Sequence, residues 1–368
     1  TSEINHSAPY YVIANTSDSA VKAVNQAIRQ GKKVYLTDDG YIVDTPTFEN
    51  LLGDYAIYGD ALYKVPNGPS LKALKVYSPP HQFYWAGVDS PTHTALALKN
   101  LGFDLVDTPE EADVVVLESN NFDKSLVGLK PTIVVGGSAM QRLEKLGLID
   151  GFNAEKFSGG SDFEGLMKAI IDDQDPLTSG YNKNDLFYSN SGNWIAKAPA
   201  NFKTLATIAG SDYYIAGWWP GNEKLANKIV AISGKYNENP LFVYAGNPTN
   251  RLHTIHFYRW ISNAVFGSQL ANLTDYILPS PTPNPIPKPQ PLTPPTYQAP
   301  SKTYQAPNQT RLDFKPATKV EPVQEIPLTY SRDSLPKTGT QEMTEGFKLA
   351  SILIACSAGL FLLKKKED

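Results

Sequence analysis

Before residue 267, apolar residues fall into short runs that are separated by segments with helical spacing. A short run that is apolar throughout is typical of a parallel strand, because helices cover both faces of such a sheet. This pattern predicts strands at 10–14, 33–36, 41–43, 73–77, 114–117, 133–135, 205–208, 229–232 and 241–244. It predicts helices at 19–30, 92–101, 139–146 and 254–266. The alternation predicts an α/β fold with a doubly wound, mostly parallel sheet.

Two folded units are expected, a small α/β unit at residues 1–68 and the main α/β domain at residues 69–270. In the small unit, Ser19 is expected to cap the first helix, and Gly31 follows that helix where a C-terminal glycine is typical. A composition change after the last predicted helix marks the end of the main domain.

Residues 271–334 hold about half of the chain's 29 prolines, many of them at alternate positions. Such a segment forms neither a helix nor a central strand, because proline lacks a backbone N–H and fixes φ. The segment also contains the short repeat Thr-Tyr-Gln-Ala-Pro at 296–300 and 303–307. We therefore expect a disordered, extended stalk that displays the preceding residues.

The last segment, 340–368, contains an apolar stretch at 349–363 that is followed by lysines 364–366. As a helix the stretch measures about 22 Å, which is short for a hydrocarbon core of about 30 Å. Flanking lysine stems and a thinner bilayer make up the difference. The lysines favour a cytoplasmic C-terminus, so the rest of the chain is expected outside the cell. A tail-anchored membrane protein is the alternative.

Immediately before this segment stands Leu335-Pro336-Lys337-Thr338-Gly339. It resembles the Leu-Pro-any-Thr-Gly signal of sortase substrates at every fixed position. The resemblance implies that sortase cleaves between Thr338 and Gly339 and links Thr338 covalently to peptidoglycan. The implied location is the cell wall of a Gram-positive bacterium, on its extracellular face. A membrane stage before sorting is also implied.

Composition narrows the remaining function classes. A net charge of −4 without a basic stripe argues against nucleic-acid binding. The single cysteine, Cys356, excludes an internal disulfide and is expected to be a small apolar residue of the last helix. The chain begins at Thr1 without a hydrophobic leader, so we expect either a removed leader or a fragment of a longer chain.

Residues with recognisable chemistry are few. None of the five histidines has the spacing of a zinc helix, so no metal site is predicted. Gly136-Gly137-Ser138 follows a predicted strand and resembles a nucleophile elbow, with His256 or His253 as the possible base. The alternative is that these three residues are the loop and N-cap of a helix that starts at Ala139.

Two further clusters have a structural and a functional interpretation. The acidic residues Asp172, Asp173 and Asp175 form either a calcium loop or a solvated turn. The adjacent tryptophans Trp218 and Trp219 either stack on a sugar or fill an edge of the core.

Residues 71–266 resemble a non-catalytic class I glutamine-amidotransferase-like domain. In particular they resemble the module that follows the catalytic domain in some bacterial secreted zinc carboxypeptidases of the carboxypeptidase A type. The matching segments, which extend into the small unit, are 11–15, 20–25, 31–35, 133–138, 175–181 and 245–254. The resemblance implies a flavodoxin-like or amidotransferase-like sheet. The catalytic cysteine of active members is replaced here by Gly137 or Ser138, and His256 lacks the glutamate that should follow it.

Three hypotheses follow for the folded part. The first is a non-catalytic accessory domain of a zinc metallocarboxypeptidase, whose zinc would belong to an upstream domain that this chain lacks. The second is a stand-alone surface module that binds a glycan or a peptide. The third is a serine hydrolase that uses Ser138. No cofactor is expected in this chain.

Overall fold

A computed structural model describes residues 4–83, 88–157 and 163–270 of the 368-residue chain. The predicted stalk at 271–334, the motif at 335–339 and the apolar segment at 340–368 lie outside the described residues. Among the described residues, no helix has both the length and the apolar character needed to cross a membrane.

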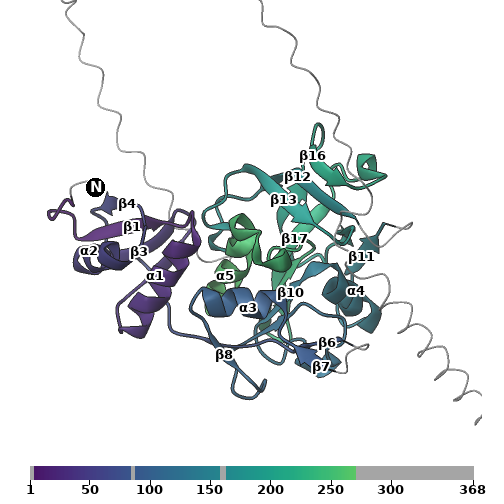
Figure 1. The fold of residues 1–368 in the computed structure, drawn as a ribbon, viewed down its shortest axis with the longest axis horizontal. Helices are drawn as coiled ribbons and strands as arrows, with labels where there is room; N and C mark the ends of the chain where they lie inside the picture. Colours follow the sequence, from purple (N-terminus) through teal and green to yellow (C-terminus); the bar gives the residue numbers. More distant parts are fainter. Residues whose placement is uncertain (1–3, 84–87, 158–162, 271–368) are drawn as a thin grey trace, which may run out of the picture. The chain divides into compact units, whose positions relative to one another are not determined.

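The N-terminal residues form an antiparallel sheet of four strands in the order β2-β3-β1-β4 (Figure 1). Helix α2 packs on β1 and β3, and α1 packs on α2. Ser17 caps α1 by accepting a hydrogen bond from the backbone N–H of Ala20, so the prediction of Ser19 as the N-cap is wrong. Gly31 follows the helix with φ +73°, as a C-terminal glycine should. The elements are β1 Tyr10–Ala14, α1 Asp18–Arg29, β2 Tyr35–Thr37, β3 Gly40–Asp44, α2 Thr45–Asp54 and β4 Gly59–Leu62.

Five parallel strands in the order β18-β10-β9-β5-β8 form one end of a second, larger sheet. Every residue of β9 and β10 is buried, which explains their uninterrupted apolar runs. Helices α3 and α5 lie on one side of β10 and α4 lies on the other (Figure 1). The α/β fold is therefore confirmed. The elements are β5 Lys75–Tyr77, α3 His93–Asn100, β8 Asp104–Val106, β9 Val114–Leu117, β10 Thr132–Val135, α4 Gly136–Leu146, β18 Asn239–Tyr244 and α5 Tyr258–Gly267.

The same sheet continues beyond β18 as an antiparallel half, in the order β17-β15-β12-β13. The predicted parallel pairing is found in the five strands β18, β10, β9, β5 and β8, and the sheet as a whole is mixed. Strand β12 has alternating exposed and buried residues, because only one of its faces is covered. The strands are β11 Asn153–Lys156, β12 Glu164–Ile171, β13 Asn184–Ser189, β14 Asn193–Lys197, β15 Lys203–Ile208, β16 Tyr214–Trp218 and β17 Ile229–Tyr236.

Short elements complete the chain. Strands β6 and β7 pair as a separate antiparallel sheet, and five 3₁₀ turns lie in connections within the described part of the chain. The last predicted helix starts later than expected, because two such turns precede α5. These elements are β6 His81–Phe83, β7 Val88–Ser90, η1 Lys124–Leu126, η2 Pro176–Thr178, η3 Asn222–Lys224, η4 Asn250–Leu252 and η5 Ile255–Phe257.

Buried hydrogen bonds connect β1 to the segments around η2 and α5. The side-chain amide of Asn15 donates to the carbonyl of Ser179 at 3.1 Å and to Oδ1 of Asn263 at 2.8 Å. Arg259 donates to the carbonyl of Asn15 at 3.1 Å. Gly180 has φ +84°, and a Cβ there would lie 1.8 Å from that same carbonyl oxygen. The close approach of the two backbones therefore requires glycine at this position.

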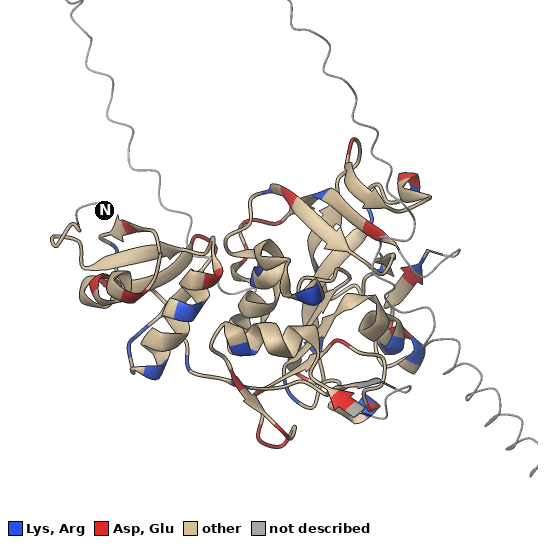
Figure 2. Ribbon diagram, in the orientation of Figure 1, with Lys and Arg blue, Asp and Glu red and all other residues tan. Residues whose placement is uncertain are grey.

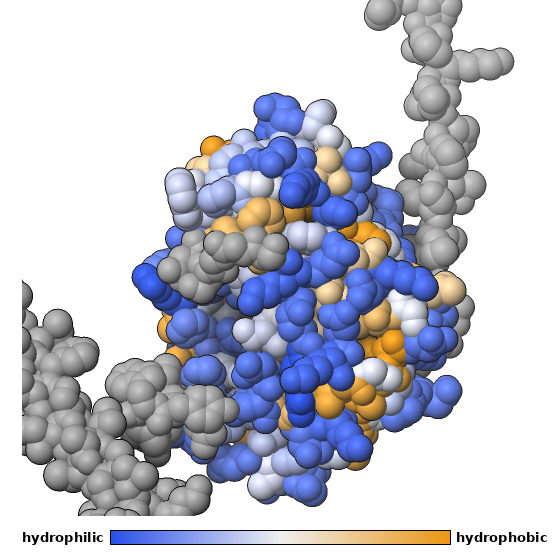
Figure 3. Space-filling model, turned by 90° about the vertical axis from the view of Figure 1, so that its right-hand side faces the viewer, coloured by the Kyte–Doolittle hydropathy of each residue, from blue (hydrophilic) through white to orange (hydrophobic). Residues whose placement is uncertain are grey.

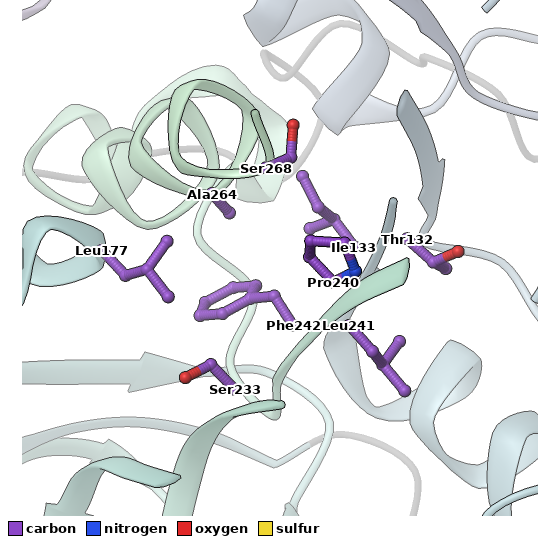
Figure 4. Close-up of a pocket in the computed structure, with 9 residues that line it drawn as sticks. All are labelled: Thr132, Ile133, Leu177, Ser233, Pro240, Leu241, Phe242, Ala264 and Ser268. Atoms are coloured by element: carbon purple, nitrogen blue, oxygen red, sulfur yellow. The ribbon is translucent and has the colours of Figure 1, made fainter. Parts of the chain in front are cut away.

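Helix α5 packs its aromatic side chains into the core. Trp260 stacks on Tyr181 and Tyr244, with ring centroids 4.9 and 4.8 Å apart. Next to this cluster, the side chains of Figure 4 enclose a cavity of about 10 Å³, where Phe242 and Ile133 face Ala264 across the gap between α5 and the sheet. A cavity of this volume holds at most about one water molecule. The core is therefore closely packed at this point.

Candidate functional site

The carboxyl ends of the parallel strands β9, β10 and β18 meet at one edge of the sheet, which is where ligands bind in open α/β folds. A polar cavity of about 520 Å³ lies at this edge. Among the described residues, no carboxylate and no aromatic side chain lines it. The surface in Figure 3, which views the right-hand side of Figure 1, is mostly hydrophilic. The lining residues are Asn120, Gly137, Ser138, Gln141, Arg142, Lys145, Lys156, Asn190, Ser191, Asn193 and Asn247.

One face of α4 forms a wall of this cavity. Its lining residues Ser138, Gln141, Arg142 and Lys145 follow the spacing i, i+3, i+4, i+7, which places them on one side of a helix. Arg142 donates to the carbonyl of Phe122 at 3.4 Å, which holds its guanidinium beside the loop after β9. The basic positions of α4 are blue in Figure 2. Because the face ends in two cations, this wall is positively charged.

The opposite wall is the turn between β13 and β14, which Asn247 holds in place. Oδ1 of Asn247 accepts hydrogen bonds from the backbone N–H of Asn190 at 3.0 Å and from the hydroxyl of Ser191 at 3.1 Å. Asn193 in turn donates to the carbonyl of Ser191 at 2.5 Å. The wall therefore presents amide and hydroxyl groups that are already fixed before a ligand arrives.

A second polar cavity of about 400 Å³ lies beside the first and shares Asn190 with it. Here the hydroxyl of Tyr188 donates to Glu164 at 2.7 Å and accepts from Asn250 at 2.7 Å. Burial and the neighbouring Glu164 raise the pKa of Tyr188 to about 12, so the phenol stays protonated. Arg251, on the rim, has φ +48°, which is a strained conformation for a residue other than glycine.

The turn from β10 into α4 has the geometry of a nucleophile elbow but holds no nucleophile. The residue at its apex is Gly136, with φ +83°. Enzymes with this turn carry the reactive side chain at the strained position. The expectation that Gly137 or Ser138 occupies this place is therefore wrong. The interpretation of these residues as a loop before Ala139 is also wrong, because α4 already begins at Gly136.

Ser138 is exposed in the first turn of α4, and no histidine bonds to it among the described residues. His256 instead contacts Asp185 through Nε2 at 2.7 Å, and its Nδ1 lies 3.1 Å from Arg259 Nη2. His253 lines the second cavity. Among the described residues, no hydrogen bond joins Ser138 to either candidate base, and both ring nitrogens of His256 already have partners.

The contact between Asp185 and His256 makes the stability of the fold depend on pH. Burial alone would raise the pKa of Asp185, but hydrogen bonds from His256 and from the backbone N–H groups of Asn182 and Leu186 outweigh it and hold the pKa below its usual value. A depressed pKa contributes stability above about pH 4, and this contribution is lost as the pH falls through the folded-state pKa.

We therefore expect Asp185→Asn to unfold more easily than the parent at pH 7, by about 1–3 kcal/mol, because the replaced carboxylate accepts several hydrogen bonds. The difference should shrink between pH 5 and pH 2, as measured by urea unfolding at each pH. The exposed Asp150 has no hydrogen-bond partner among the described residues, so Asp150→Asn is the control. A difference that grows toward low pH would contradict the assignment.

The other predicted clusters have structural roles. Lys203 Nζ lies 2.8 Å from Asp172 and 2.7 Å from Asp175, so two of the three proposed calcium ligands form ion pairs with a lysine. No group of three or more potential metal ligands occurs among the residues that the structure describes. Trp219 is buried and only Trp218 is exposed, at 69% of its surface. The adjacent tryptophans therefore do not form one stacking platform.

Comparison with protein families identifies the C-terminal segment. Residues 328–368 match the family model described as the LPXTG cell wall anchor motif. The protein is anchored to the cell wall of a Gram-positive bacterium. It is secreted, and the motif implies processing by sortase and covalent attachment to peptidoglycan. A comparison with curated proteins finds no match.

Solved structures with a similar fold include three from other microorganisms. A protein described as a candidate GMP synthase component from Thermoplasma acidophilum shows 14% identity and a TM-score of 0.37, with 53% of this chain and 94% of that chain covered. A ThuA-like protein from Parabacteroides merdae shows 11% identity and a TM-score of 0.33, with 57% of this chain and 93% of that chain covered. A glutamine amidotransferase from Thermotoga maritima shows 10% identity and a TM-score of 0.32, with 56% of this chain and 99% of that chain covered. Similarities of this size say nothing about function.

Sequence reasoning found the elbow but missed most of the site around it. Lys145, Lys156 and the asparagines of the 190–193 turn gave no motif, because they come from separate elements. One signal was present in the sequence, namely the polar spacing of Ser138, Gln141, Arg142 and Lys145 along a predicted helix.

Proposed function

We propose that the folded part is a non-catalytic domain that the protein displays on the cell wall. The observation that supports this most strongly is Gly136 at the elbow, since a glycine offers no nucleophile at the one position where this turn would present it. Ser138 lies further along α4 and has no base within hydrogen-bond distance among the described residues. We therefore propose that the polar cavity beside Ser138 binds a ligand and does not catalyse a reaction.

The resemblance to the module that follows the catalytic domain in secreted zinc carboxypeptidases suggests a more specific role for the domain. On this proposal it is the accessory domain of a secreted zinc metallocarboxypeptidase, whose zinc site lies on a separate domain. The support is the set of matching segments spread over residues 11–254. A reading frame that encodes a zinc-peptidase domain immediately upstream of Thr1 would agree with it. A signal peptide in that position would contradict it and favour the stand-alone binding module.

The absence of catalysis has a direct test. The full chain, purified in detergent, is incubated with glutamine and with a panel of esters, amides and peptides. We expect no turnover above buffer and no difference between the parent chain and Ser138→Ala. Hydrolysis that disappears in Ser138→Ala, while circular dichroism shows an unchanged fold, would establish a serine hydrolase and overturn the proposal.

The apolar segment 340–368 supports a membrane stage before sorting. On this proposal the stretch 349–363 holds the chain in the bilayer, and lysines 364–366 keep the last residues on the cytoplasmic side. The scissile bond between Thr338 and Gly339 then stays outside the membrane until sortase cleaves it.

A further inference from the structure

The cavity between α4 and the 190–193 turn has the lining of a site for an anion. Three of the described side chains that line it, Arg142, Lys145 and Lys156, are cationic, whereas none of the described ones is acidic. Neither lysine has an ion-pair partner among the described residues. Like charges gathered around a hollow repel one another, so an anion in the cavity would relieve this repulsion.

The N-terminus of α4 adds to the positive potential. Val135, the residue before the helix, provides no side-chain cap, and Gly137 and Ser138 of the first turn line the cavity. The free N–H groups at the start of a helix of this length attract phosphate and carboxylate groups. A Cβ at Gly137 would lie 1.9 Å from Nδ2 of Asn193, so only glycine lets the turn approach the helix this closely.

Buried polar atoms without a hydrogen-bond partner are a separate indication that the cavity binds a polar ligand. Asn193 is 3% exposed, and its Oδ1 has no hydrogen-bond partner among the described residues. Nε2 of Gln141 and Nε of Arg142 are also buried without a partner in the described part of the chain. All three residues line the same cavity, and two of the three atoms are N–H donors. Buried donors without partners are rare, so a group that accepts hydrogen bonds is expected nearby.

The other lining groups indicate what the anion carries. The amide of Asn120, Oδ1 of Asn190 and Nδ2 of Asn247 can pair with hydroxyl groups, because only the other amide atoms of Asn190 and Asn247 bond within the chain. Among the described residues, the lining contains no apolar or aromatic side chain for a hydrophobic ligand. A volume of about 520 Å³ exceeds the need of a bare phosphate ion. From these features we infer that the cavity binds a phosphorylated, hydroxyl-rich ligand, such as a sugar phosphate unit of a wall polymer. The inference rests on the proposed non-catalytic role and names the ligand class for that site.

The phosphate contacts come from the two lysines at the rim and the start of α4, and the hydroxyl contacts come from the asparagines. Lysine acts as a point charge for phosphate, and Arg142 is already fixed by its bond to Phe122. Because both lysines are exposed, replacing them leaves the core untouched.

The test is calorimetric titration of the full chain in detergent with four probes: glucose 6-phosphate, glucose, glucuronate and inorganic phosphate. We expect glucose 6-phosphate to bind most tightly. The double variant Lys145→Gln/Lys156→Gln should weaken that binding at least tenfold, which corresponds to about 1.4 kcal/mol or more. Lys99→Gln, an exposed lysine on α3 that does not line the cavity, is the matched control and should bind like the parent.

Several outcomes would overturn the inference. They are equal binding of glucose and glucose 6-phosphate, tighter binding of glucuronate, equal binding of inorganic phosphate, and no binding of any probe. An equal loss of glucose 6-phosphate binding in Lys99→Gln would also overturn the inference, since it would show that positive charge anywhere on the surface attracts the ligand. Release of phosphate during the titration would instead contradict the non-catalytic role, so the two failures are distinguishable.

Discussion

Replacing Thr338 with alanine is expected to remove the protein from the cell-wall fraction and leave it in the membrane fraction. The motif match at 328–368 implies that sortase acts on Leu335-Pro336-Lys337-Thr338-Gly339. We expect the carbonyl of Thr338 to become the point of covalent linkage, so a motif that sortase does not cleave should keep the apolar segment attached. The measurement is immunoblotting of wall, membrane and medium fractions, and we expect at least a tenfold loss from the wall.

The motif itself provides the matched control. Lys337 stands at the position where any residue is tolerated, so Lys337→Ala should remain in the wall fraction at the parent level. If Thr338→Ala and Lys337→Ala distribute in the same way, the sorting role of the motif fails, whichever fraction they share.

Replacing Trp260 with alanine is expected to destabilise the folded part by about 3–5 kcal/mol, the range for large aromatic residues in cores. The side chain is 1% exposed and stacks on Tyr181 and Tyr244. Its removal leaves a hole beside the cavity that Phe242 and Ala264 already border (Figure 4). The measurement is urea unfolding followed by circular dichroism and fluorescence.

The matched control is Trp260→Phe, which keeps an aromatic ring in the stack. The indole N–H of Trp260 has no hydrogen-bond partner among the described residues, so phenylalanine loses no polar contact. We expect this variant to lose clearly less stability than Trp260→Ala. A loss below about 1 kcal/mol for Trp260→Ala would contradict the assignment of Trp260 to a closely packed core.

Strands β9 and β10 of the parallel half were predictable because every residue of both is buried. Strand β8, which has no buried residue, was not predicted. The predicted runs at 114–117 and 133–135 have no charged interruptions, and they proved to lie in β9 and β10. The antiparallel half was harder to predict. Strand β12 alternates exposed and buried residues and contains Lys168, so it produces no continuous apolar run. Strand β16 is apolar in sequence but mostly exposed, so its run does not mark a core strand. Long-range pairing rather than local pattern determines these strands.

The site was predictable only where one local segment forms it. The glycines at 136 and 137 marked a strand-to-helix turn, but the sequence did not tell which of the residues occupies the strained position. That depends on where α4 begins, and helix starts without a capping side chain leave no signal. The cationic wall and the asparagine turn come together only through the packing of α4 against β11 and β14.

Mass spectrometry of the C-terminal peptide of the native protein tests wall anchoring most directly. Protein released from the wall by a muramidase should end at Thr338 and carry a peptidoglycan fragment on its carboxyl group. Detection of an intact C-terminus at Asp368 in wall-derived protein, with no peptide that ends at Thr338, would contradict the account.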